Sequence, residues 1–183
     1  MAIQEKSYEN TISSARNELT NLLDALKTFE FPERINKLLK LGDIELNSFV
    51  SEIPVGSNEE DYIYILKVVG RNRTNRVFYD KLEDEKAKPN NPKDFPRLNK
   101  KHKGSQYLYV GRSHKLRSRI RQHLGSGHKG TYALHMMRWA NKIEENIELQ
   151  YFKLEGVENL VVQAVEDALW SELRPAFGRK GDK

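Results

Sequence analysis

The apolar residues near the N-terminus follow the period of a helix. Between residues 12 and 29 they recur at alternating steps of three and four, which places them on one stripe: Ile12, Ala15, Leu19, Leu22, Leu26 and Phe29. Residues 32–41 begin with a proline and end before Gly42, which predicts a second helix. The two helices predict a hairpin that serves as a packing cap or as a dimerisation arm. The cap is favoured because the stripe covers fewer than three heptads.

Three later segments are predicted to be strands, and the first two of them have the composition of interior strands. YIYILKVV at 62–69, YLYV at 107–110 and IELQYFKL at 147–154 are rich in aromatic and β-branched residues. Residues 81–104, KLEDEKAKPNNPKDFPRLNKKHKG, contain three prolines, many charges and few apolar residues. This composition predicts a long loop rather than a packed element.

Helices are predicted after the second and third of these strands. Ser113 is a suitable N-cap for a helix that runs to about Leu124, where GSG ends it, and residues 157–173 form a helix that Pro175 terminates. The order of elements predicts an α+β domain with a small, mainly antiparallel three-stranded sheet flanked by helices. Residues 1–55 are expected to form an acidic helical extension, and residues 56–183 the main domain, with a long insertion at about 70–106.

Composition limits the classes of protein to be considered. The 183 residues are 38% hydrophobic and 31% charged, which suits one compact domain. No apolar run approaches the roughly 18 residues of a membrane span, and the N-terminus lacks a signal-peptide pattern, so we expect a cytoplasmic protein without membrane contact. The absence of cysteine excludes disulfides, a thiolate zinc site and a cysteine nucleophile.

The charge is distributed unevenly along the chain. Residues 1–60 carry 6 basic and 11 acidic side chains, whereas residues 61–183 carry 25 basic and 15 acidic ones. Residues 95–143 contain no Asp or Glu, but 12 Lys or Arg and all five histidines. A basic region of this length attracts polyanions by neutralising phosphates and releasing counterions, so nucleic acid is the expected partner.

The segment YVGRSHKLRSRIRQHL, residues 109–124, combines several groups suited to phosphate chemistry. Tyr109 ends a strand, Gly111 permits a sharp turn, and the following helix would direct Leu116, Ile120 and Leu124 to the core. On that helix Arg119 and His123 lie one turn apart, beside the tyrosine that the strand supplies. Guanidinium groups bind phosphate oxygens in a fixed fork.

These motifs together resemble the GIY-YIG nuclease superfamily, most closely its restriction endonuclease members. The resemblance covers roughly residues 61–178. It rests on YIY at 62–64, YVG at 109–111, the spacing of Ser113, Leu116, Arg119 and His123, and Glu166 followed nine residues later by Pro175. Two positions depart from the family pattern: Tyr62 replaces a glycine, and Gly178 stands where an asparagine is expected.

The resemblance implies a magnesium-dependent DNA endonuclease, a type II restriction or related defence enzyme. Manganese is expected to substitute for magnesium. The implied roles are water activation by Tyr64, contact with the phosphate by Tyr109, a hydrogen bond within the site by His123 and metal binding by Glu166, while Arg119 would hold the scissile phosphate. Double-stranded DNA is the expected substrate, and a homodimer would suit a palindromic site. The side chains expected to contact the DNA backbone are Lys100, Lys101, Lys103, Arg112, Lys115, Arg117, Arg121 and Lys129.

The choice of metal ligand also follows from helix geometry. With about 100° per residue, the 157–173 helix has an apolar arc with Glu166 at its edge, while Asp167 is predicted to face solvent. The arc comprises Val161, Val162, Val165, Ala168, Leu169 and Leu173. Glu172 lies nearer the centre of this arc and remains a rival, although Glu166 is favoured.

Three other interpretations remain open. The chain could be a non-catalytic DNA-binding module on the same fold, a structure-specific repair or RNA-cleaving nuclease, or a basic scaffold that contains the motif by coincidence.

Overall fold

The computed structural model describes residues 2–41, 46–70, 76–89, 95–126 and 130–181. Four antiparallel strands form one sheet in the order β1-β4-β2-β3. The strands are β1 (Ile35–Lys40), β2 (Glu60–Val69), β3 (Tyr107–Ser113) and β4 (Asn146–Glu155). The α-helices are α1 (Ala2–Thr28), α2 (Leu46–Ser51), α3 (Arg76–Ala87), α4 (Leu116–Arg121) and α5 (Asn159–Leu173). Short helical turns are η1 (Lys100–His102), η2 (Gln122–Ser126) and η3 (Met136–Arg138).

The α+β class is confirmed, but the sheet has four strands rather than three. The fourth strand, β1, occupies the segment predicted as the second helix, so the helical hairpin is wrong. β1 pairs with β4 along its whole length, and only Leu39 of its six residues is buried. Because β1 is an edge strand with one buried side chain, its sequence carries little period-two signal and the pairing with β4 decides its conformation. β1 thereby completes the sheet of the domain predicted to start at residue 56.

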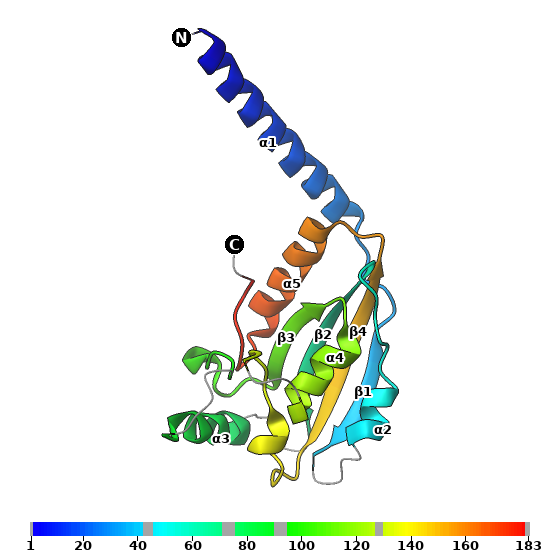
Figure 1. Cartoon of the computed structure of the whole chain (residues 1–183), viewed down its shortest axis with the longest axis vertical. Helices are drawn as coiled ribbons and strands as arrows, with labels where there is room; N and C mark the ends of the chain where they lie inside the picture. The colour runs from blue at the N-terminus through cyan, green and yellow to red at the C-terminus, as the bar shows by residue number, and fades with distance from the viewer. Residues whose placement is uncertain (1, 42–45, 71–75, 90–94, 127–129, 182–183) are drawn as a thin grey trace.

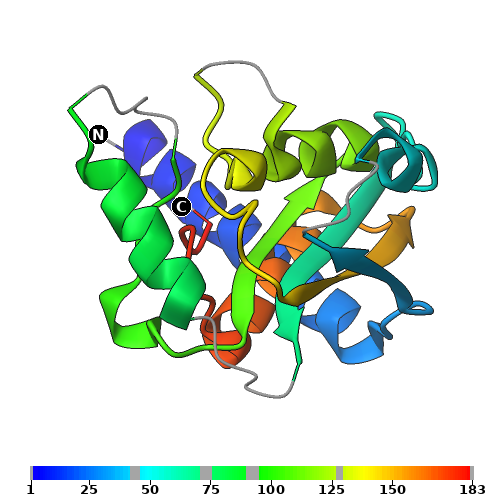
Figure 2. The same cartoon turned by 90° about the horizontal axis from the view of Figure 1, so that it is seen from below.

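The two faces of the sheet support two separate clusters of apolar side chains. Alternate residues of β2 point to opposite faces, so Tyr62, Tyr64, Leu66 and Val68 join one cluster with residues of α3 and α4. The other face carries Ile63 and Ile65 together with Val110, Phe152 and Leu154, and α5 covers it. Figure 2 shows α4 and α5 on opposite sides of the sheet.

The insertion at about 70–106 contains packed structure, contrary to the prediction of a long loop. α3 forms within it, with Phe78, Tyr79 and Leu82 buried on one side, and Phe95 is buried as well. A β-bridge joins Leu98 to Phe177. The helix was missed because its apolar positions are few and are surrounded by charged residues that lie on its exposed side.

The first helix is confirmed, and most of it projects away from the rest of the protein (Figure 1). Only its last turns are packed, where Leu22, Ala25 and Leu26 lie against the α5 side of the sheet. Ile12 and Leu19 of the apolar stripe are 53% and 66% exposed. The packing-cap interpretation therefore applies only to the C-terminal part of α1. Within the described ranges, each helix is too short or too polar to cross a membrane.

The helix predicted after Ser113 is shorter than expected. β3 extends to Ser113 itself, α4 begins at Leu116, and after Arg121 the chain continues as a π-helical turn. Gly125, within this turn, has φ of +120°. The predicted strand at 147–154 and helix at 157–173 are confirmed as β4 and α5.

Candidate active site

Two tyrosines from adjacent strands lie at the bottom of the candidate site. Tyr64 of β2 lies opposite Gly111 of β3, and the rings of Tyr64 and Tyr109 are stacked with centroids 6.1 Å apart at 9°. A Cβ atom at residue 111 would lie 2.7 Å from Tyr64 Oη and 2.8 Å from Tyr109 Cε1. Because Gly111 has no side chain, the two phenol rings can lie close to its Cα, where a Cβ would otherwise collide with them.

Arg119 and His123 meet the tyrosines from above the sheet. Tyr64 Oη lies 2.9 Å from His123 Nε2 and accepts a hydrogen bond from Arg119 Nε at 3.2 Å. Arg119 Nη2 donates to Tyr109 Oη at 3.3 Å. The predicted core residues of this segment, Leu116, Ile120 and Leu124, are all buried and hold it against the sheet. The structure thus brings together four of the five predicted catalytic residues.

The hydrogen bonds of His123 determine which nitrogen carries its proton. The ring is completely buried, and the backbone N–H of Leu134 donates to Nδ1 at 3.2 Å. Burial, together with Arg119 and His135, lowers the pKa of His123 well below its usual range, so the ring is neutral. A neutral ring that accepts at Nδ1 carries its proton on Nε2, and it therefore donates to Tyr64 Oη.

Tyr64 consequently accepts two hydrogen bonds at its phenolic oxygen, and its own O–H is left to donate to a third group. Burial raises the pKa of this phenol above its usual range, and the neighbouring Tyr109 adds to the effect. The positive charge of Arg119 acts in the opposite direction. In this form of the protein, Tyr64 is neutral, with two donors already in place for a phenolate.

Arg119 has two further acceptors that the sequence did not predict. Nη1 donates to Gln122 Oε1 at 3.0 Å, and Nη2 donates to the backbone oxygen of Tyr132 at 2.9 Å. Four of its five N–H groups are therefore directed at protein atoms, and one N–H on Nη1 remains. Gln122 could have been suspected from its position three residues after Arg119, whereas no local signal indicates Tyr132.

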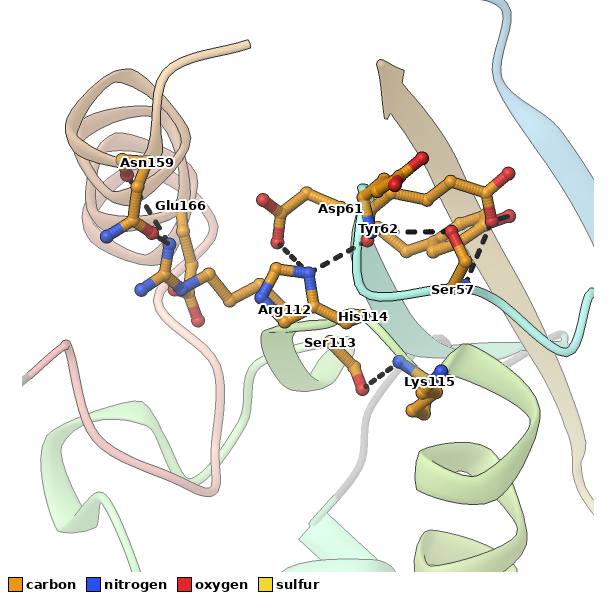
Figure 3. A network of polar contacts seen from close by, with 11 residues as sticks. Ser57, Asp61, Tyr62, Arg112, Ser113, His114, Lys115, Asn159 and Glu166 are labelled. Atoms are coloured by element: carbon orange, nitrogen blue, oxygen red, sulfur yellow. Dashed lines mark hydrogen bonds and ion pairs between the residues drawn. The ribbon is translucent and has the colours of Figure 1, made fainter. Parts of the chain in front are cut away.

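Glu166 lies on α5, and among the described residues its side chain forms an ion pair with Arg112 rather than with a member of this cluster. Its Oε2 is 3.5 Å from Arg112 Nε, and Arg112 Nη1 also donates to Asn159 Oδ1 at 2.7 Å (Figure 3). The Glu166 side chain is 14% exposed. The negative charge of Glu166 raises the pKa of Tyr64, and the positive charge of Arg119 lowers the pKa of Glu166. Burial raises the pKa of Glu166 to about 7, although Arg112 opposes this shift.

The neighbours of Glu166 on α5 differ in part from the prediction. Asp167 is buried rather than facing solvent, because its Oδ1 accepts from Gly181 N at 2.9 Å and from Gln163 Nε2. Ala168 is exposed instead of belonging to the apolar arc, whereas Val161, Val162 and Val165 are buried as expected. Glu172 is exposed in the last turn.

The single carboxylate of Glu166 fits a magnesium ion that takes its other ligands from water and phosphate. Among the described residues, no three His, Asp or Glu side chains gather into a cage. A single carboxylate can nevertheless hold magnesium when water and substrate phosphate supply its remaining ligands. Since Arg112 contacts Oε2, the second oxygen of Glu166 is the one suited to the ion.

The basic residues predicted to bind DNA have different environments. Lys100 and Lys101 are exposed in η1, and Lys115 and Arg121 are exposed on either end of α4. Lys103 is ion-paired with Asp80 at 2.6 Å, and Arg117 donates to the backbone oxygens of Ile53 and Ser51. Arg112 is ion-paired with Glu166 and bonded to Asn159. The charges of Lys103 and Arg112 are therefore paired within the protein, whereas Arg117 keeps its charge but has N–H groups engaged by backbone carbonyls. Lys129 lies outside the described residues.

The site therefore joins four side chains by hydrogen bonds, whereas Glu166 is ion-paired with Arg112 and acts on Tyr64 through its charge. No protein-family model, curated protein or solved structure matches the chain.

Proposed function

We propose that the chain is a magnesium-dependent endonuclease that hydrolyses phosphodiester bonds in DNA. The observation that carries the proposal is the hydrogen-bonded cluster of Tyr64, Tyr109, Arg119 and His123, with the carboxylate of Glu166 beside it. Two phenols, a guanidinium and an acid around one point provide what phosphodiester hydrolysis requires: a group to orient water, a positive charge and a ligand for a cation. The motif resemblance to GIY-YIG nucleases supports the same assignment.

Tyr64 is the proposed general base. To act as a base, Tyr64 must first lose its own proton to solvent, and the resulting phenolate oxygen then accepts a proton from the attacking water. The Nε–H of Arg119 and the Nε2–H of His123 both point at this oxygen, so they stabilise the phenolate. His123 cannot accept this proton at Nε2 while Nδ1 remains bonded to Leu134 N. Its role is to position the phenol rather than to transfer a proton.

Arg119 donates hydrogen bonds to both tyrosines, and we propose that it also donates to the substrate once the substrate is bound. Its unused N–H can donate to a phosphate oxygen, and the bond of 3.3 Å to Tyr109 Oη is the longest of its contacts and the easiest to exchange. Because Tyr109 is the acceptor in that bond, its own O–H is available to donate to the same phosphate.

Glu166 is the residue that would hold magnesium. When bound, the ion supplies Lewis-acid stabilisation of the phosphoryl and leaving oxygens. Glu166 must be ionised to bind it, and burial works against ionisation. Arg112 keeps one oxygen of the carboxylate in contact with β3 and so orients the other.

Cleavage of supercoiled plasmid with and without magnesium tests the proposal. We expect nicking by the wild-type protein, and loss of nicking in Glu166→Gln and in Arg119→Ala with thermal unfolding monitored for each. Glu172→Gln is the matched control, because it removes the same charge from an exposed position on the same helix. Full activity in Glu166→Gln with none in Glu172→Gln would assign the metal to the rival residue. An inactive wild-type protein would refute the catalytic function.

The finer proposal is a type II restriction or related defence enzyme that acts on double-stranded DNA. Comparison of duplex, branched and single-stranded DNA with RNA would separate it from a structure-specific repair enzyme or an RNA-cleaving one. A non-catalytic binding module would bind DNA and cleave none of these substrates.

A further inference from the structure

Two adjoining clefts extend away from Tyr109 along one side of the protein. The first, of about 620 Å³, is bordered by Tyr109 and Tyr132, and the second, of about 690 Å³, is bordered by His102 and Trp170. The residues common to both are Arg97, Gly178, Arg179 and Lys180. Because they share these lining residues, the two clefts adjoin each other, and the first of them reaches Tyr109 of the candidate active site; the two clefts together are called the groove.

The groove is lined by cations and by no carboxylate among the described residues. Lys86 borders the first cleft, Lys100 and Lys101 border the second, and Arg97, Arg179 and Lys180 border both. Within the described part of the chain, no carboxylate forms an ion pair with Arg97 or Lys180, whereas Lys103 nearby is paired with Asp80. Among the described residues, the charge of Arg97 and Lys180 is therefore not neutralised, as expected of groups that bind an anion.

Backbone hydrogen bonds fix the two walls of the groove relative to each other. Gly178 N donates to Arg97 O at 2.9 Å, and Asn99 N donates to Ala176 O at 2.8 Å. The Asn99 side chain donates to Pro175 O and to Gly178 O, at 2.9 and 3.1 Å. Arg97 and Lys180 are exposed, but the backbone that carries Arg97 is held in place, so binding would order little more than side chains.

An exposed aromatic ring stands where the groove meets the active site. Tyr132 is 63% exposed, although its backbone oxygen is held by Arg119 at 2.9 Å. A ring that is exposed on a fixed backbone, next to cations, is suited to stack on a nucleic-acid base. This ring is also adjacent to the point at which the scissile phosphate would lie.

We infer that this groove binds the substrate strand on one side of the scissile phosphate, with phosphates on Arg97 and Lys180 and the nearest base stacked on Tyr132. The inference rests on the proposed function for the position of the scissile phosphate. A polynucleotide fits the observations better than a mononucleotide, because the cationic lining continues through both clefts. Of the DNA-contacting residues predicted from the sequence, the groove uses only Lys100 and Lys101.

Binding in the absence of divalent cations tests the groove separately from catalysis. The affinity of Arg97→Ala/Lys180→Ala for a short fluorescent DNA oligonucleotide would be measured by anisotropy over a series of salt concentrations. Each lost phosphate contact should reduce the salt slope by about 0.7 to 0.9 and weaken binding on the order of tenfold at about 0.1 M salt. Lys27→Ala/Arg34→Ala is the matched control, since it removes two exposed charges from α1 and from the β1 side of the protein.

The outcomes distinguish this inference from the proposed function. Weaker binding and a smaller salt slope in the groove variant, with wild-type behaviour in the control, support the groove even if no cleavage is observed. Equal effects in the two double variants, or no effect in the groove variant, overturn it even if the wild-type protein cleaves DNA. Tyr132→Ala should weaken binding roughly tenfold and reduce quenching of a 2-aminopurine base next to the cleavage point, and Tyr132→Phe should restore both. Wild-type quenching in Tyr132→Ala overturns the stacking part.

Discussion

Replacement of Gly111 by alanine is the most direct test of how the site is built. The residue lies opposite Tyr64 in the β2–β3 ladder, and its missing side chain leaves space for two stacked rings. The added Cβ would meet Tyr64 Oη at 2.7 Å, Tyr109 Cε1 at 2.8 Å and Tyr64 Cζ at 3.0 Å. These atoms belong to rigid rings, and Tyr64 is completely buried, so the rings can only move as whole groups.

The size of the effect follows from these distances. Non-bonded carbon atoms attract each other best at about 3.5 to 4.0 Å, so each ring would have to move by more than about half an ångström. Such overpacking typically costs about 1 to 3 kcal/mol of unfolding free energy. For a chain of this length, that corresponds to a decrease in Tm of roughly 2 to 12 °C. The displaced Tyr64 oxygen would also lose its geometry with Arg119 and His123, so we expect cleavage to decrease by more than the loss of stability explains.

Urea unfolding and plasmid nicking measure the two effects. Gly104→Ala is the matched control, because a Cβ at residue 104 has no atom within 4 Å and should change neither quantity. In a Tyr64→Phe background the cost of Gly111→Ala should become smaller, because the closest atom is absent. Wild-type stability and wild-type cleavage in Gly111→Ala would refute the close approach of the two tyrosines.

Three further predictions address groups with other roles. Tyr64→Phe should abolish cleavage and lower the free energy of unfolding by about 1 to 3 kcal/mol, because it leaves the N–H donors of Arg119 and His123 without their acceptor; an active variant in the nicking assay would exclude Tyr64 as the base. The pKa of Glu166 is raised from 4.5 to about 7, so the free energy of unfolding should decrease by up to about 1.4 kcal/mol per pH unit as the pH rises between these values. In urea titrations Glu166→Gln should flatten this pH profile, and identical profiles for the variant and the wild-type protein would contradict the shift. The exposed apolar stripe of α1 should pair with the same helix of a second copy, so sedimentation of the wild-type protein should show a dimer. Ile12→Asp/Leu19→Asp should convert this dimer to a monomer, whereas the control Asn21→Asp should not. A monomeric wild-type protein would exclude the pairing.

The parts of the fold that the sequence predicted are those with strong local patterns. β2, β3 and β4 are rich in aromatic and β-branched residues, and α1 and α5 have long apolar stripes. β2 and β4 are interior strands, whereas β3, predicted to be interior, lies at the edge of the sheet. β1 and α3 have too few buried residues for such a pattern, and their conformations depend on contacts distant in the sequence. Pairing with β4 fixes the first, and burial of three side chains fixes the second. Neither partner can be identified from the local sequence.

The site was predictable to a similar extent and for a related reason. Gly111 lies two residues after Tyr109 in the same strand, and Arg119 and His123 lie one turn apart in the segment that follows, so their spacing in the sequence already groups them. The groove residues Arg97, Arg179 and Lys180 come from two segments about 80 residues apart, and only the bridge between them brings their charges together. The structural contacts of Lys103 and Arg117 could not be foreseen either, because their acceptors lie on other elements.

The structure next to the Leu98–Phe177 bridge explains why residue 178 is a glycine rather than the expected asparagine. The φ of Gly178 is +93°, and a Cβ there would lie 2.8 Å from Tyr109 Cε2, so Tyr109 is enclosed between two glycines, Gly111 and Gly178. An asparagine at residue 178 would both strain the backbone and displace the ring. Asn99 braces this segment, because its side chain donates to the carbonyl oxygens of Pro175 and Gly178. The insertion that contains Asn99 is therefore part of the support of the site, and shortening it should loosen the segment that holds Tyr109 in place.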